Sequence, residues 1–196
     1  MFEIFKTDKS LYFQIVLATL PVTLAGKTAW SALLAAVTAV LAAVGGSLIV
    51  TALKKFLNIK TAPFALLITA VGVVGVCTLL AELFFPAVAQ TLGFTLALVA
   101  VAVPFTVSCD FCLNQNLLGS GLTALLLSGV QAGFMLTCGV VREILGSGSL
   151  FGLDLYSKWF SPVTFFTTPA GGLLTAALLL VVYGLLVKPR KVKEAE

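Results

Sequence analysis

The sequence predicts an all-α integral membrane protein with six transmembrane helices in a single polytopic domain, residues 1–196. Two observations predict this fold class. Apolar residues make up 60% of the chain and charged residues only 10%, whereas a typical soluble domain carries about a quarter charged residues. Several apolar runs also approach or exceed the roughly 20 residues that a spanning helix needs, and only short polar breaks separate most of them.

The apolar runs define the positions of the expected spans. They lie near residues 11–25, 29–53, 63–85, 91–109, 119–141 and 170–187. The segment Met1–Ser10 is polar, and no small-residue cleavage site follows a short apolar core as it would in a secretory signal. We therefore expect the first run to remain in the membrane.

The distribution of basic residues predicts the orientation. Six spans put both termini on one side, and nine of the 12 Lys and Arg residues fall on that side. The positive-inside rule then places residues 1–10 and the basic tail 188–196 in the cytoplasm. The clustered net charge of +4 fits anchoring beside anionic membrane lipid better than binding of nucleic acid.

Two prolines suggest an internal repeat. The first span is short and is interrupted at Thr19-Leu20-Pro21, and the fourth at Ala102-Val103-Pro104. Three helices per half make the two halves inverted, and paired proline-broken helices then indicate a site near the membrane midplane. The alternative is that each proline is a tolerated kink.

Small residues and one long connection complete the organisation of the chain. We expect the small residues of the spans to let helices pack closely; they are Gly45, Gly46, Ser47, Gly72, Gly75, Gly129 and Gly133. The longest non-apolar connection runs from Gly146 to about Pro169, on the expected outer face. Its Tyr156 and Trp159 suit an aromatic belt at the membrane interface, and the loop is where a partner could dock.

Cys109-Asp110-Phe111-Cys112 is the sharpest candidate for chemistry. Two thiols separated by two residues can converge on one metal or one disulfide. An iron–sulfur cluster usually takes four thiolates, so this pair would supply half a site unless Cys77, Cys138 or a partner completed it. The alternative is that these cysteines are small apolar side chains of membrane helices. Asp110 is either solvated at the interface or used for ions.

Other charged residues stand at the ends of spans. Glu82, near the outer end of the third span, either reaches the interface or binds a cation or proton. Arg142-Glu143 closes the fifth span, with a glycine stop expected at Gly146. Because adjacent residues do not share a helix face, these two need not pair with each other. The chain contains no histidine, the commonest proton relay and metal ligand.

One segment resembles a known family. The stretch 141–152 reads Val-Arg-Glu-Ile-Leu-Gly-Ser-Gly-Ser-Leu-Phe-Gly. It is similar to the Arg-Glu-Ile-Leu-Gly-Asn-Gly-Thr-Leu-Phe-Gly motif of the Rnf/Nqr membrane subunits, in the branch formed by the E subunit of Rnf and the D subunit of Nqr. Looser similarity at the first-span proline, Lys54-Lys55, the 90–93 segment and Val103-Pro104 extends the resemblance over nearly the whole chain.

The resemblance implies a subunit of an ion-translocating electron-transport complex. Such a subunit pairs with an inverted homologous membrane subunit, and the two hold an iron–sulfur cluster between their broken helices. Electron transfer between ferredoxin or NADH and a flavin or quinone is coupled to movement of sodium ions or protons. The chain would act as scaffold and as part of an electron or ion path, and would not be catalytic alone.

The chain departs from the family at the cluster cysteines. The family's first cysteine precedes the proline of a Gly-Leu-Cys-Pro segment, where this chain has Leu20. The second, in a Thr-Asn-Cys segment, aligns with Asp110, and Cys109 lies one residue early. Leucine cannot ligate iron, so the chain has either an altered redox centre using Cys109 and Cys112 or is a non-redox paralogue that acts in complex assembly. A component of a six-helix small-solute transporter is the alternative from another class.

Overall fold

The computed structural model describes residues 28–58, 60–84, 86, 96–103, 116–151, 153–154 and 163–186. Within these ranges the elements in chain order are α2 (Ala29–Ala52), α3 (Ala62–Phe84), α6 (Leu117–Ser147), β1 (Ser149–Leu150), β2 (Leu153–Asp154), the 3-10 helix η2 (Thr164–Thr167) and α7 (Pro169–Leu186). The segment 96–103 is also helical.

A local sequence signal marks the start of α2. Thr28 forms a capping box with Ser31: each side chain accepts the backbone N–H of the other residue, at 3.3 and 3.2 Å. The reciprocal bonds satisfy donors that the first turn of a helix leaves without partners. The expected spans at 29–53 and 63–85 are thus confirmed by α2 and α3. The segment expected to span at 170–187 is helical, as α7, but its described apolar part is shorter than a span.

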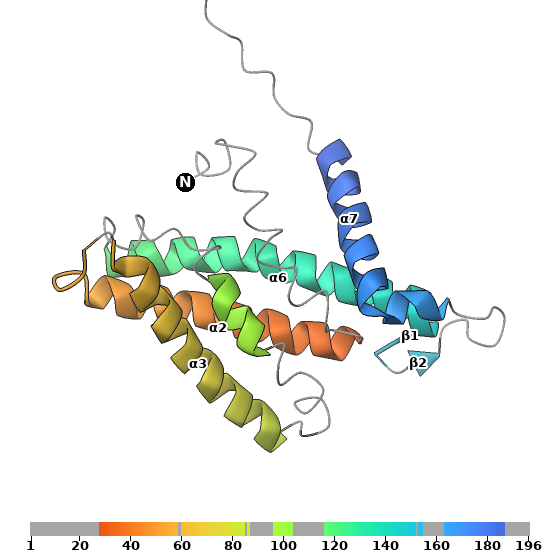
Figure 1. Ribbon diagram of the computed structural model, residues 1–196, viewed down its shortest axis with the longest axis horizontal. Helices are drawn as coiled ribbons and strands as arrows, with labels where there is room; N and C mark the ends of the chain where they lie inside the picture. Colours follow the sequence, from red (N-terminus) through yellow and green to blue (C-terminus); the bar gives the residue numbers. More distant parts are fainter. Residues whose placement is uncertain are drawn as a thin grey trace, which may run out of the picture.

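α2 and α6 run antiparallel side by side and form the spine of the molecule (Figure 1). At one end the hydroxyl of Thr51 hydrogen-bonds to the hydroxyl of Ser120 at 2.8 Å. Toward the other end, Gly139 of α6 faces Ala32 of α2 so closely that a Cβ on Gly139 would lie 2.3 Å from the Ala32 Cβ. In lipid no hydrophobic force drives helices together. Helices associate there through close van der Waals contact, which such small residues allow.

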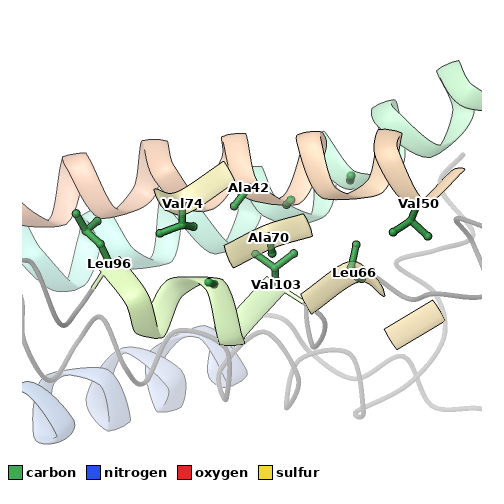
Figure 2. Packing of buried hydrophobic residues seen from close by; sticks show 10 residues of the cluster. Ala42, Val50, Leu66, Ala70, Val74, Leu96 and Val103 are labelled. Atoms are coloured by element: carbon green, nitrogen blue, oxygen red, sulfur yellow. The ribbon is translucent and has the colours of Figure 1, made fainter. Parts of the chain in front are cut away.

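A core of small and branched side chains fills the space between α2, α3 and the 96–103 helix (Figure 2). Each helix contributes buried residues, and α6 adds Ala124 at the edge of the cluster; the members labelled in the figure are Ala42, Val50, Leu66, Ala70, Val74, Leu96 and Val103. Gly45 and Gly46 bring α2 against Val73 and Leu66 of α3, since a Cβ on either glycine would lie 3.2–3.3 Å from those side chains. The packing predicted for these two glycines is confirmed.

The outward faces of the helices are apolar. In the described part of the chain, α2, α3 and α6 are each long and apolar enough to cross a membrane. α3 is the least covered of them, and its large exposed side chains include Phe64, Ile68, Leu79, Leu83 and Phe84. A surface of this kind suits lipid or another membrane helix and not water, so the chain is a membrane protein.

α6 confirms the expected fifth span at 119–141 but extends beyond it, and the expected glycine stop at Gly146 was wrong. The helix does not end at 141 or stop at Gly146, but continues to Ser147 and ends at Gly148, which adopts the left-handed conformation (φ 67°). Gly146 stays helical, and its missing side chain allows a close contact: a Cβ there would lie 2.8 Å from Thr167 Cγ2. At about 1.5 Å per residue the 31-residue helix is roughly 46 Å long, well beyond the roughly 30 Å hydrocarbon core.

Other expectations have different outcomes. No atom of the described residues lies within 4 Å of a Cβ built on Gly72, Gly75, Gly129 or Gly133, so these four do not pack helices together there. The expected first span and both prolines, Pro21 and Pro104, lie outside the described residues, and only 96–103 of the fourth span lies within them. The six-helix topology with two inverted halves remains a prediction.

Candidate functional site

Arg142 lies near the end of α6 with its guanidinium buried; the residue is 1% exposed. Nε donates a hydrogen bond to the carbonyl of Phe166 (3.2 Å), and Nη2 donates to the carbonyls of Thr167 (3.4 Å) and Thr168 (3.2 Å). These carbonyls belong to the end of η2 and the residue before α7. A carbonyl cluster at a helix C-terminus carries partial negative charge, so it suits the planar, multidentate guanidinium.

Glu143 points to a different partner, the start of α2. The residue is 3% exposed, its Oε2 accepts the backbone N–H of Ala29, and its Oε1 accepts a long hydrogen bond from Ser149 Oγ (3.4 Å). Ala29 is the first residue of α2, where the N–H groups have no intrahelical acceptor and the helix dipole is positive. The carboxylate therefore caps α2 from another helix.

Backbone contact between α6 and the η2–α7 junction surrounds these side chains. Val163 N–H donates to the carbonyl of Leu145 (3.1 Å), and Gly146 packs on Thr167 as described above. On the other side, a Cβ on Gly171 would lie 2.3 Å from the carbonyl oxygen of Phe165. A larger residue at Gly146 would push α6 away from the η2–α7 junction, and a larger residue at Gly171 would clash with η2.

A short hairpin folds from the end of α6 toward α2. Gly148 N–H donates to the carbonyl of Ile144 (3.1 Å), and β1 then pairs antiparallel with β2 through a turn that contains Phe151 at φ 52°. The ring of Phe151 meets Trp30 of α2 edge to face, with centroids 5.4 Å apart and planes at 84°. This favourable aromatic geometry holds the hairpin against the first turn of α2.

We call this cluster the α6 joint: Arg142, Glu143 and Gly146, with their partners Ala29 and 166–168. Burying charge in a membrane protein is costly unless each group is satisfied. In the described ranges no buried side-chain nitrogen or oxygen lacks a hydrogen-bond partner. The prediction that the adjacent Arg and Glu need not pair agrees with these contacts, because the two side chains bind different segments. The joint holds together the end of α6, the start of α2 and the η2–α7 junction.

The structure describes three of the remaining candidate residues, Glu82, Cys77 and Cys138. Glu82 is exposed in the last turn of α3. Cys77 on α3 is half-buried and Cys138 on α6 is buried, and both are free thiols. Cys109, Asp110 and Cys112 lie outside the described residues. Among the residues that the structure does describe, no three His, Cys, Asp or Glu side chains form a group that could hold a metal ion.

Sequence reasoning identified Arg142 and Glu143 but missed what they bind. Four of the acceptors and donors are backbone groups, in Ala29 and in 166–168, which carry no side-chain signal. The available signals were indirect. A Thr-x-x-Ser capping pattern at Thr28 marks the start of α2, and Gly171 marks a close approach beside the Thr167-Thr168-Pro169 segment.

Two known proteins are similar to this chain over much of its length. The E subunit of the Na⁺-translocating ferredoxin:NAD⁺ oxidoreductase complex of Acetobacterium woodii is 29% identical over 175 residues, which cover 86% of each chain. The E subunit of the proton-translocating ferredoxin:NAD⁺ oxidoreductase complex of Clostridium ljungdahlii is 26% identical over 138 residues, which cover 68% of this chain and 63% of the relative. No family model matches the sequence. Both relatives are E subunits of ferredoxin:NAD⁺ oxidoreductase complexes, and the Rnf E subunit belongs to the branch whose motif the 141–152 segment resembles.

Proposed function

We propose that the chain is the membrane subunit of an ion-translocating ferredoxin:NAD⁺ oxidoreductase complex of the Rnf type. The observation that carries this proposal is the match to the E subunit of such a complex, which extends over 86% of both chains. The apolar helices provide the membrane part that such a subunit needs. The α6 joint, built from the motif that the chain shares with the family, supports a role as scaffold.

Copurification tests this function. An affinity tag on the full chain should recover, from mildly solubilised membranes, an assembly that contains flavin and iron and transfers electrons from reduced ferredoxin to NAD⁺. Deleting the gene for this chain should abolish that activity in membranes, and the restored gene should return it. Recovery of an ATPase with no redox cofactor would instead identify a solute transporter.

The coupling ion is a second point to measure. The names of the two relatives differ, one Na⁺-translocating and the other proton-translocating, so kinship alone does not choose between the ions. Either ion would cross the membrane through the complex that this chain forms with its partner subunits. Radioactive sodium uptake into inverted vesicles, driven by ferredoxin oxidation, separates the two: uptake that a protonophore stimulates indicates Na⁺, and absence of uptake indicates the proton.

We further propose that Cys109 and Cys112 supply thiolates to an iron–sulfur cluster shared with an inverted homologous subunit. Thiolates are the usual ligands of such clusters, and two per chain make half of a four-thiolate set. The aligned position Leu20 cannot ligate, and Asp110 is a hard oxygen donor, so the pair at 109 and 112 is the available thiolate source in that part of the chain. A bound cluster would provide a one-electron carrier within the membrane.

Electron paramagnetic resonance on the reduced complex tests the thiol assignment. The double change Cys109→Ala with Cys112→Ala should remove or shift the signal of a membrane-embedded cluster, whereas Cys77→Ala should leave it unaltered. If the signal survives the double change, Cys109 and Cys112 are not the cluster ligands. If no such signal exists in an assembled complex, the chain is a non-redox paralogue.

The topology of the proposed subunit has six spans, in two inverted three-helix halves broken at Pro21 and Pro104, with both termini in the cytoplasm. The antiparallel arrangement of α2 and α6 brings the α2–α3 loop and the start of α6 to one end of the bundle. Lys54, Lys55 and Lys60 lie in that loop. The positive-inside rule therefore favours the cytoplasmic side of the inner membrane for this end.

A further inference from the structure

The loop between α2 and α3 carries concentrated positive charge. Lys54, Lys55 and Lys60 are all exposed, and the segment 51–63 contains no Asp or Glu. The other charged residues in the described ranges are Glu82, Arg142, Glu143 and Asp154. Since Arg142 is buried in the α6 joint, every exposed Lys or Arg in those ranges lies in this one loop.

Hydrogen bonds and one apolar contact hold the described residues of the loop. Leu57 packs against the core between α2 and α3, and the N–H of Phe56 donates to the carbonyl of Leu53 at 2.9 Å. Asn58 and Thr61 bind each other through two hydrogen bonds, from Asn58 N–H to Thr61 Oγ1 (3.1 Å) and from Thr61 Oγ1 to the Asn58 carbonyl (3.0 Å). Because Leu57 is anchored inward, its neighbour Phe56 is left 86% exposed.

The position of the loop relative to the bilayer follows from the helices that it joins. α2 ends at Ala52 and α3 begins at Ala62, and both are long and apolar enough to span. Phe64, in the first turn of α3, is 72% exposed and belongs with the acyl chains. Because the loop joins the ends of these two helices, we expect the lysines and Phe56 at the level where hydrocarbon gives way to phosphate head groups. Exposed aromatic rings beside lysines are favoured there and unfavourable in open water.

We propose that the α2–α3 loop binds the phosphate head groups of anionic lipids. The ammonium groups of Lys54, Lys55 and Lys60 contact the phosphates, and the ring of Phe56 inserts among the upper acyl segments. Three basic residues near an anionic surface are attracted at about 1 kcal/mol each. This inference requires only that the chain lies in a membrane, and is independent of the proposed electron-transport function.

Native mass spectrometry of the purified full chain tests the site. Phosphatidylglycerol and phosphatidylcholine are titrated separately, and we expect the anionic lipid to bind at least tenfold tighter. The triple change K54Q/K55Q/K60Q should weaken phosphatidylglycerol binding by about fivefold per lysine, the equivalent of about 1 kcal/mol each. F56S should weaken binding of both lipids without a change in charge. Size-exclusion profiles check that each variant remains folded.

The matched control is K188Q/K191Q/K193Q, which removes the same charge from the C-terminal tail. This control should retain phosphatidylglycerol binding at the loop. Equal affinities for the two lipids, or equal losses in both triple variants, would overturn the proposal. Complete displacement of the lipid by inorganic phosphate at the same concentration would also overturn it. If the triple loop variant kept its lipid but lost other subunits on copurification, the loop would be a protein interface instead.

Discussion

Arg142 and Glu143 are neighbours in the chain whose side chains stabilise different helix ends. The guanidinium satisfies carbonyls at the end of η2, and the carboxylate satisfies an N–H at the start of α2. Each charge meets the end of a helix with the opposite partial charge. The two can therefore be perturbed separately, and each perturbation should appear in a different part of the molecule.

Glu143→Ala should lower the stability of the purified chain by about 2 kcal/mol, because the buried N–H of Ala29 loses its acceptor. Glu143→Gln keeps an acceptor but loses the charge at the helix terminus, for about 1 kcal/mol. Thermal unfolding followed by tryptophan fluorescence measures both. The matched control is Glu82→Gln at an exposed site, with a change of about 0.5 kcal/mol or less; equal effects at the two positions would contradict the capping role.

Arg142→Lys should destabilise the start of α7 by about 2 kcal/mol, because a lysine cannot reproduce the fork of donors that reaches three carbonyls. Hydrogen exchange measured by mass spectrometry locates the effect. We expect faster exchange of the amides in 168–172 and little change at the start of α2, whereas Glu143→Gln should give the opposite pattern. The same exchange pattern in both variants would show that the joint opens as one unit.

At the scale of the elements, contacts between helices are decided by single glycines. Gly139 and Gly133 both lie in α6, yet only Gly139 meets another helix within the described residues. Gly146 and Gly148, at the end of α6, have different roles. The first admits the η2–α7 junction and the second supplies the left-handed backbone that ends the helix.

Gly139→Ala should destabilise the fold by about 1–3 kcal/mol, because its Cβ would overlap Ala32 and force α2 and α6 apart. Gly133→Ala, six residues earlier on the same helix, should be neutral or stabilise by up to about 1 kcal/mol through helix propensity. Thermal unfolding of both variants measures the difference. Equal effects would place the close approach of the two helices elsewhere.

At the scale of the whole molecule, the two ends of the bundle differ in charge. One end carries the exposed lysines of the α2–α3 loop, and the other carries the α6 joint and the β1–β2 hairpin. At that second end the only basic residue that the structure describes is Arg142, which is buried. This asymmetry favours a cytoplasmic loop and an external hairpin.

Cysteine accessibility checks this orientation. A membrane-impermeant maleimide should label Lys55→Cys only in inverted vesicles and Leu153→Cys only in right-side-out vesicles, since both positions are exposed. The wild-type chain, with its four native cysteines, gives the background. The reverse labelling pattern would invert the topology and place the termini outside.

The sequence by itself determined the membrane class, the extents of α2, α3 and α7 and the identity of the two charged residues in the joint. Apolar run length is a local property, so the bilayer thickness converts it directly into helices. The segment 141–152 resembles a motif of the Rnf/Nqr membrane subunits, and the similarity to the E subunits of two ferredoxin:NAD⁺ oxidoreductase complexes agrees with that resemblance.

Only the tertiary structure decided what those residues contact and which glycines pack. The partners of Arg142 and Glu143 are backbone groups in segments far away in the chain, and a backbone carbonyl is the same for every residue type. Gly146 and Gly148 look alike in the sequence, but in the structure Thr167 packs beside Gly146, whereas Gly148 adopts the left-handed conformation that ends α6. Sequence patterns report what a residue prefers, whereas the neighbour that it meets depends on how the helices pack.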